Sequence, residues 1–184
     1  MSGYAKAIFG YIFLGMLLLT SCAYTTRSAL SSHHKTIAVP VFINKTYNEG
    51  YARRLEIEVT EAARNAFIQV GELKLASREN ADLILEGEVT KLEREIARID
   101  RFGDPAETRL TIRARVSLYD VKEAKYLLKN QLVTNAEKHG ESGVYNVRRG
   151  EYEAQAREKA VEDLGRMIAR RVTDRWPTKE PVKP

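Results

Sequence analysis

The sequence predicts an α+β fold, a two-layer sandwich in which two amphipathic helices cover one face of a mainly antiparallel sheet of about four strands. Three stretches support it. Thr108–Val121 alternates between apolar and polar residues, which is typical of a strand with one buried face. Tyr51–Val70 and Glu151–Trp176 repeat apolar residues every three or four positions, as amphipathic helices do. A helix at each end of a run of strands favours two packed layers.

Residues 1–21 have the features of a secretory signal peptide. Lys6 precedes the apolar run Ala7–Leu19, which is shorter than the roughly 20 residues of an ordinary membrane-spanning helix. The run leads into Leu19–Cys22, and Cys22 is the only cysteine in the 184 residues. A soluble secreted protein with an incidental cysteine and a short retained anchor helix are the alternatives.

The order apolar, small, small, cysteine at Leu19–Cys22 resembles the lipobox of bacterial lipoproteins. The resemblance implies that the chain is cut before Cys22, that its thiol carries a diacylglycerol and that the new amine is acylated. A thiolate is nucleophilic enough to accept the lipid, and two or more acyl chains hold a protein stably on a membrane. Because Ala23 and not Asp follows, the resemblance also implies sorting to the outer membrane.

The composition of the chain without residues 1–21 suits a single domain, which we expect at residues 36–176. Its 163 residues carry 29 Lys and Arg against 25 Asp and Glu, a balance too even for general nucleic-acid binding. A lone cysteine excludes an internal disulfide and a cysteine metal site, so this domain depends on its hydrophobic core.

The segment between the cysteine and the domain, residues 22–35, is rich in Ser and Thr and is expected to be a flexible tether. It contains His33 and His34, which we interpret as a solvent-exposed pair because no third metal ligand lies nearby. The strands of the domain are expected at Thr36–Phe42, Leu73–Ala76, Ala81–Ile99, Thr108–Val121 and Tyr126–Thr134.

Four details of the elements are also predicted. Pro40 places its strand at a sheet edge or bulge, and Gly87 leaves room for a helix to pack closely. The apolar parity of the long strand changes after Val89, which predicts a bulge near Thr90. In the closing helix Gly165 is a mild defect, and residues 177–184 are expected to form a frayed tail.

No catalytic constellation stands out in the sequence. Gly140–Gly143 lacks the spacing of a nucleophile elbow, and His139 is a lone histidine in a predicted loop. The sequence has no glycine-rich phosphate loop and no Cys/His metal cluster. We therefore expect a protein that is not an enzyme and that carries no metal and no cofactor beyond the covalent lipid on Cys22.

Several soft motifs, in their order and spacing, resemble the lipopolysaccharide-assembly lipoprotein family, LptE. They are a lipobox cysteine, the strand Ile37–Phe42 followed by Asn44 and Thr46, a helix, the segment Ala81–Gly87, an alternating strand and a closing amphipathic helix. The resemblance implies an outer-membrane lipoprotein that plugs the lumen of a large β-barrel, LptD, assists assembly of the barrel and helps deliver lipopolysaccharide to the outer leaflet. A compact, non-catalytic domain with polar outer faces suits a polar barrel lumen.

Arg109, Arg113 and Arg115 form a row on the sheet face that the helices are expected to leave uncovered. Arginine offers planar, bidentate donors for phosphate, and lipopolysaccharide carries phosphates, so the resemblance makes these residues candidates for binding it. The alternatives are a solvated face with cross-strand ion pairs to Glu86 and Glu88, or contact with the barrel wall.

Other classes of envelope protein begin with a similar first strand. A lipoprotein activator of a peptidoglycan synthase and a subunit of a secretion pore are the main alternatives. A pore subunit would need transmembrane strands of about 9–11 alternating residues. The strand around Arg113 has that parity, but the helical partner segments explain it better as part of a core. A lipoprotein with another envelope role is a third possibility.

Overall fold

The computed structural model describes residues 34–46, 52–136 and 143–174. The expected signal peptide, Cys22, His33, His139 and the tail at residues 177–184 lie outside this part of the chain. The strands are β1 (Thr36–Ala38), β2 (Ile43–Asn44), β3 (Lys74–Leu75), β4 (Leu83–Ile99), β5 (Pro105–Asp120), β6 (Lys125–Thr134) and β7 (Val144–Tyr145). The helices are α2 (Leu55–Val70), α3 (Glu153–Thr173) and the short 3₁₀ turns η1 (Arg78–Asn80) and η2 (Val147–Arg149).

The fold is α+β with two long helices against one sheet, as predicted, but the sheet differs from the prediction. It is mixed and has seven strands, in the order β3-β1-β4-β5-β6, with β2 beside β4 and β7 beside β5. β1 and β2 run parallel to β4, whereas β4, β5 and β6 are antiparallel neighbours. The parallel pairs arise because α2 carries the chain back before β4 begins, and such a crossover joins parallel strands.

The first predicted strand, Thr36–Phe42, is shorter in the structure. β1 ends at Ala38, before Pro40, which has no N–H to donate to a ladder, and β2 begins at Ile43, beyond the predicted end. β1 itself is not an edge strand, since it pairs with β3 on one side and β4 on the other. The predicted bulge near Thr90 is confirmed, because the register between β4 and β5 shifts between Val89 and Lys91.

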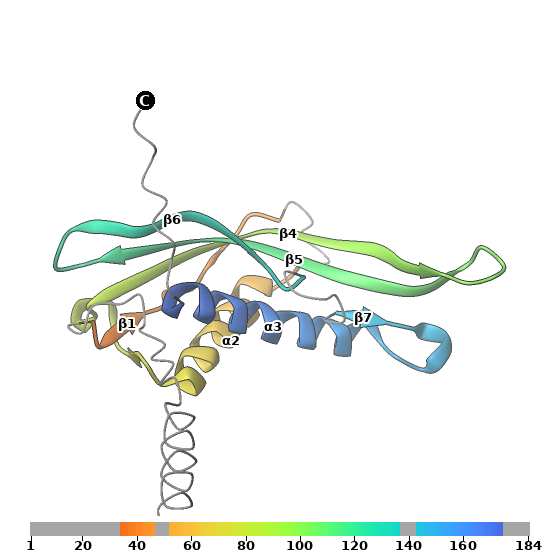
Figure 1. Ribbon diagram of the computed structural model, residues 1–184, viewed down its shortest axis with the longest axis horizontal. Helices are drawn as coiled ribbons and strands as arrows, with labels where there is room; N and C mark the ends of the chain where they lie inside the picture. Colours follow the sequence, from red (N-terminus) through yellow and green to blue (C-terminus); the bar gives the residue numbers. More distant parts are fainter. Residues whose placement is uncertain (1–33, 47–51, 137–142, 175–184) are drawn as a thin grey trace, which may run out of the picture.

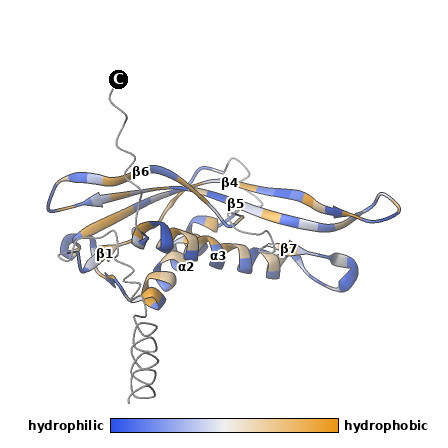
Figure 2. Ribbon diagram, viewed as in Figure 1, coloured by the Kyte–Doolittle hydropathy of each residue, from blue (hydrophilic) through white to orange (hydrophobic). Residues whose placement is uncertain are grey.

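Both helices lie against the same face of the sheet, with α3 under β5 and α2 beside α3 (Figure 1). Apolar residues concentrate where the helices and the sheet meet (Figure 2). The fully buried side chains there include Ile37, Leu83, Leu85, Ile112, Leu55, Val59, Phe67, Leu164 and Ile168. No helix in the described ranges is both long enough and apolar enough to span a bilayer.

Two glycines allow close packing in this core. A Cβ on Gly165 would lie 2.5 Å from the carbonyl carbon of Ala62, so this residue brings α3 against the backbone of α2 and is not a mere defect. A Cβ on Gly87 would lie 2.6 Å from the ring of Phe42. The sequence predicted that a helix packs over Gly87. The ring of Phe42 fills this space instead.

Candidate ligand-binding groove

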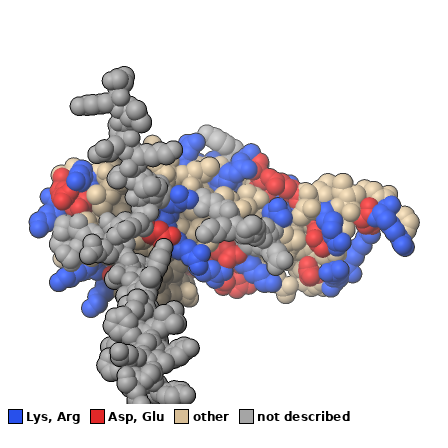
Figure 3. Space-filling view, viewed as in Figure 1, with Lys and Arg blue, Asp and Glu red and all other residues tan. Residues whose placement is uncertain are grey.

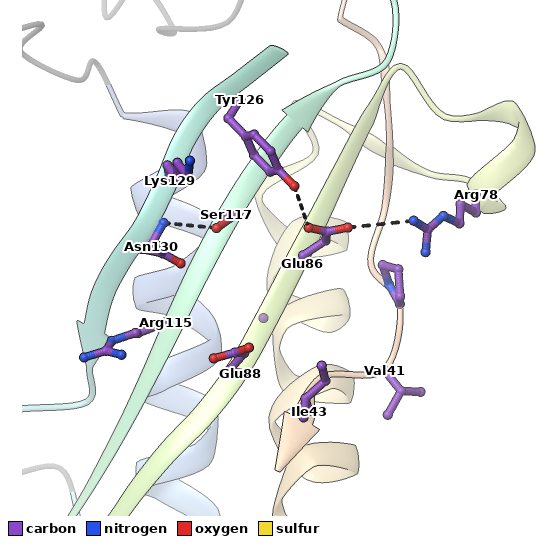
Figure 4. A pocket seen from close by; sticks show the side chains of 12 residues that line it. Val41, Ile43, Arg78, Glu86, Glu88, Arg115, Ser117, Tyr126, Lys129 and Asn130 are labelled. Atoms are coloured by element: carbon purple, nitrogen blue, oxygen red, sulfur yellow. Dashed lines mark hydrogen bonds and ion pairs between the residues drawn. The ribbon is translucent and has the colours of Figure 1, made fainter. Parts of the chain in front are cut away.

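A groove with a volume of about 540 Å³ opens on the sheet face opposite the helices (Figure 4). Strands β4, β5 and β6 contribute polar side chains to it, and the segment joining β1 to β2 contributes an apolar wall. Its lining residues are Pro40, Val41, Ile43, Arg78, Glu86, Gly87, Glu88, Arg115, Ser117, Tyr126, Lys129 and Asn130.

Strand alternation and one bulge bring the polar groups together. Glu86 and Glu88 on β4 face the groove because Leu85 and Val89 beside them point into the core. On β6 the alternation is interrupted at Asn130, which has a φ of 51° and donates its N–H to the Ser117 hydroxyl at 3.0 Å. This bulge adds residues to β6 opposite β5.

The two carboxylates of the groove are already engaged. Glu86 accepts a hydrogen bond from the Tyr126 hydroxyl at 3.2 Å and lies 3.7 Å from the Arg78 guanidinium. The negative charge of Glu86 and this hydrogen bond raise the pKa of Tyr126. Glu88 is paired with the Lys45 ammonium group at 2.7 Å. Because each carboxylate has a cationic side chain next to it, its repulsion of a bound anion is reduced.

Two cations at the groove have no carboxylate partner. Among the described residues, neither Arg115 nor Lys129 lies within ion-pair distance of a carboxylate. Glu88 is opposite Arg115 in the strand register, yet its carboxylate binds Lys45 instead. The groove therefore has an uncompensated positive end on β5 and β6.

The opposite wall of the groove is apolar and open to solvent. Val41 and Ile43 are each 56% exposed, although most large aliphatic side chains of this fold are buried. A groove with uncompensated cations on one side and exposed hydrocarbon on the other is suited to an anionic amphiphile, which offers a charged group and an alkyl chain together (Figure 4).

The three predicted arginines share one strand face but do not form one site. Arg113 pairs with Glu93 at 3.1 Å, and Arg109 is six positions from Arg115, a distance of about 20 Å along a strand. Arg109 is half-buried, and its Nε has no hydrogen-bond partner in the described part of the chain. The expected pairs of the arginines with Glu86 and Glu88 do not form, since Arg78 and Lys45 occupy those carboxylates.

Sequence reasoning missed the residues that complete the groove. Lys129 and Tyr126 lie on a strand whose irregular alternation was visible, but the position of its bulge was not. Val41 lies in the strand predicted at Thr36–Phe42 but is exposed at the groove, and Arg78 comes from η1, between two predicted strands.

The molecular surface gives little support to nucleic-acid or metal binding. Lys and Arg side chains are interspersed with Asp and Glu over the visible face (Figure 3). Within residues 34–46, 52–136 and 143–174, no three His, Cys, Asp or Glu side chains gather as a metal site requires.

Comparison with known proteins identifies the family. No curated protein matches the chain. The model of the LptE lipopolysaccharide-assembly family matches residues 34–176, which is most of the chain and all of the folded domain. The chain belongs to the LptE family. Its members are lipopolysaccharide-assembly proteins, in agreement with the resemblance stated from the sequence.

Solved structures with a similar course of the chain have low sequence identity to this LptE-family protein. The PelC dodecamer of Paraburkholderia phytofirmans is 13% identical, with a TM-score of 0.44 over 79% of this chain and 94% of that one. An uncharacterized lipoprotein B from Nitrosomonas europaea is 13% identical, with a TM-score of 0.47 over 76% and 83%. The rare lipoprotein B from Shewanella oneidensis is 12% identical, with a TM-score of 0.35 over 72% and 91%. At these scores, the likenesses carry no conclusion about function.

Proposed function

We propose that this chain is an outer-membrane lipoprotein that plugs an LptD-like β-barrel, assists its assembly and helps deliver lipopolysaccharide to the outer leaflet. Membership of the LptE family supports the general role. The proposal includes removal of residues 1–21 and lipidation of Cys22, which would hold the domain beside its barrel and raise their effective concentration. It assigns the chain no catalytic step and no cofactor besides the covalent lipid.

The groove is the proposed contact with lipopolysaccharide. The observation that carries this assignment is the presence of two uncompensated cations, Arg115 and Lys129, across the groove from the exposed wall of Val41 and Ile43. A phosphate of the lipid would bind the guanidinium and ammonium groups, and an acyl chain would cover the apolar wall. Arg113 is engaged by Glu93 and Arg109 lies beyond the groove, so these two have a secondary part.

The binding test replaces both groove cations. We expect the double variant Arg115→Glu, Lys129→Glu to bind purified lipopolysaccharide at least about tenfold more weakly, because charge-assisted hydrogen bonds contribute roughly 1.5–3 kcal/mol each. The matched control is Lys159→Glu, Arg170→Glu, which makes the same charge change on exposed positions of α3. Equal weakening in both variants would show that only overall charge matters and would remove the groove from the proposal.

The partner test uses the lipidated protein extracted in detergent from the cell envelope. The proposed function expects a very large barrel protein to copurify in a roughly equal ratio. Recovery of a transpeptidase in its place would overturn the barrel role and favour an activator of peptidoglycan synthesis.

A further inference from the structure

Three exposed apolar side chains lie at one end of the molecule, on the tip of the β4–β5 hairpin (residues 96–108). The tip extends past the end of α3 (Figure 1). Ile96 and Ile99 are each 58% exposed, and Phe102 is 75% exposed, the highest value among the large hydrophobic side chains of the described residues. Exposed apolar groups that gather in this way mark a site of contact with a protein or a membrane.

The turn that carries Phe102 is well ordered by hydrogen bonds. The Asp100 carboxylate accepts the N–H groups of Phe102 at 2.8 Å and Asp104 at 3.0 Å, and the Asp100 N–H donates to the Asp104 carbonyl at 2.9 Å. Gly103 has a φ of 88°, in the left-handed region that favours glycine. Arg148 of η2 binds the Asp100 and Asp104 carboxylates at 2.5 Å and 3.1 Å. The ring is therefore presented by a preorganised turn, which reduces the entropy lost on binding.

The charges around the tip balance one another. Together with Arg148, the tip carries as many arginines as carboxylates. Arg98 pairs with Glu107 at 2.7 Å, and the Arg101 guanidinium lies 4.7 Å from the centroid of the Phe102 ring. Lys and Arg side chains alternate with Asp and Glu at this end of the molecule (Figure 3). Because no field of one sign arises, apolar contact and not charge would drive binding by the tip.

The size and shape of the tip favour a bilayer over a protein as its occupant. Each side of a standard protein interface contributes roughly 20–30 residues and about 800 Å², more than the narrow end of one hairpin offers. A bilayer needs no complementary pocket, because apolar side chains bury themselves roughly 5–10 Å into the boundary between headgroups and acyl chains. Aromatic rings are enriched at that level.

The depth of such a contact is limited by Asp100. The Phe102 and Asp104 amides, above all, hold the pKa of Asp100 below its usual range, so this carboxylate is ionised at neutral pH. A charged group is costly in hydrocarbon, and the turn would therefore lie among the headgroups. Three residues along a strand span about 10 Å, so Phe102 and Ile99 would reach the acyl boundary while Ile96 stays nearer to water.

We propose that the tip of the β4–β5 hairpin is a non-covalent membrane contact, in which Phe102 and Ile99 insert into the interfacial region of a phospholipid bilayer. This contact goes beyond the proposed function, and neither lipopolysaccharide nor a barrel takes part in it. A contact this shallow is weak by itself. On a domain that is already confined to a membrane, it would restrict which side of the domain faces the bilayer.

Tryptophan quenching tests the contact in the full chain. Trp176→Phe removes the only tryptophan, and Phe102→Trp places a reporter at the tip. The chain, with residues 1–21 retained, is reconstituted into phosphatidylcholine vesicles with or without bromine on the acyl chains close to the headgroup. We expect brominated lipid to lower the emission at residue 102 by at least about twofold, and the loss to persist at high salt because the contact is apolar.

The matched control places the reporter on α2 by Ile68→Trp, since Ile68 is also aliphatic and is 64% exposed. Brominated lipid should leave this reporter unquenched. Ile99→Asp, added to the tip reporter, puts a charge beside the ring and should reduce the quenching at least about fivefold. Circular dichroism checks that the fold survives this change at an exposed position.

Unquenched emission at residue 102 would overturn the membrane contact, and so would equal quenching at residues 102 and 68. Quenching that disappears at high salt, or that a folded Ile99→Asp variant leaves unchanged, would also contradict apolar insertion. If Ile99→Asp does not fold, the comparison of residues 102 and 68 decides. The vesicles contain neither lipopolysaccharide nor a barrel, so the tip contact and the proposed function can fail separately.

Discussion

The hairpin formed by β4 and β5 has two halves with the same local pairing and very different surroundings. Its base, Leu83–Val89 with Ala114–Asp120, has the helices beneath it and β1, β2 and β6 beside it. Its tip, from Ile96 through the turn to Thr108, extends past the end of α3 (Figure 1), and β7 pairs with it at Thr108. The base alternates between fully buried and open positions, whereas Ile96, Ile99 and Phe102 at the tip are 58%, 58% and 75% exposed. Alternation therefore predicts a strand, but neighbouring elements decide whether its apolar face is buried.

The largest difference between the two halves is expected when one apolar side chain in each is truncated and the loss in the free energy of unfolding is compared. Leu85→Ala at the base is expected to lower the free energy of unfolding by about 2–5 kcal/mol, because Leu85 is fully buried. Ile96→Ala at the tip should change it by less than about 0.5–1 kcal/mol. Urea denaturation measures both, and similar losses would mean that the tip is covered in solution.

The second largest difference in stability is expected when a larger side chain is introduced into each half. Gly87→Val should destabilise the domain by about 1–3 kcal/mol, because even its Cβ would overlap the buried ring of Phe42. Ala97→Val is the matched change at the tip, where residue 97 is exposed and should tolerate the larger side chain. Thermal unfolding of both variants checks this, and a stable Gly87→Val would contradict the packing of Phe42.

The third largest difference is expected in how the free energy of unfolding depends on pH when one aspartate in each half is replaced. The folded pKa of Asp120 lies below its unfolded value, so the ionised carboxylate contributes stability above about pH 4, and this contribution is lost as the pH falls through the folded pKa. Unfolding free energies of the unsubstituted chain and Asp120→Asn should therefore converge below about pH 4. Asp100 at the tip also has a lowered pKa, chiefly through the Phe102 and Asp104 amides. Its partner Arg148 is exposed, so Asp100→Asn should show the smaller pH dependence.

The ion pair at the junction of the halves should give the smallest effect. Arg113 and Glu93 are 3.1 Å apart and both partly open to water, so Arg113→Gln should cost less than about 1 kcal/mol. Arg98→Gln, which breaks the pair with Glu107 at the tip, is the comparable change. A loss well above 2 kcal/mol for Arg113→Gln alone would show that the junction holds the two halves in register.

Local patterns carried much of the fold. The alternation from Leu110 to Leu118 identified the buried face of β5, and the change of parity after Val89 located the bulge of β4. The helices also occur where their spacing placed them, with ends shifted by a few residues, as is usual at helix termini. These features depend on neighbours along the chain.

Features that depend on distant neighbours were missed. The parallel pairing of β1 with β4 follows from the path of the chain around α2, which no local period records. The prediction that His34 is solvent-exposed is wrong, because its side chain is buried 2.7 Å from Asp120 of β5. Val41, in contrast, is exposed although it lies in a predicted strand. The surroundings of both residues come from other strands, which a local pattern does not record. Arg115 and Lys129 are visible as charges in the sequence, but the sequence does not show that Glu88, opposite Arg115, pairs with Lys45 instead.

The parallel position of β1 also bears on how the chain reaches its native state. β1 lies between β3 and β4, both of which come after α2 in the sequence, so it has no strand partner while only the N-terminal part of the chain is available. Pairing between strands so far apart in sequence requires closure of a long loop, and this slows folding relative to hairpins such as β4–β5. Until that closure, the apolar segment from Ile37 to Phe42 exposes an unpaired edge of the kind that aggregates.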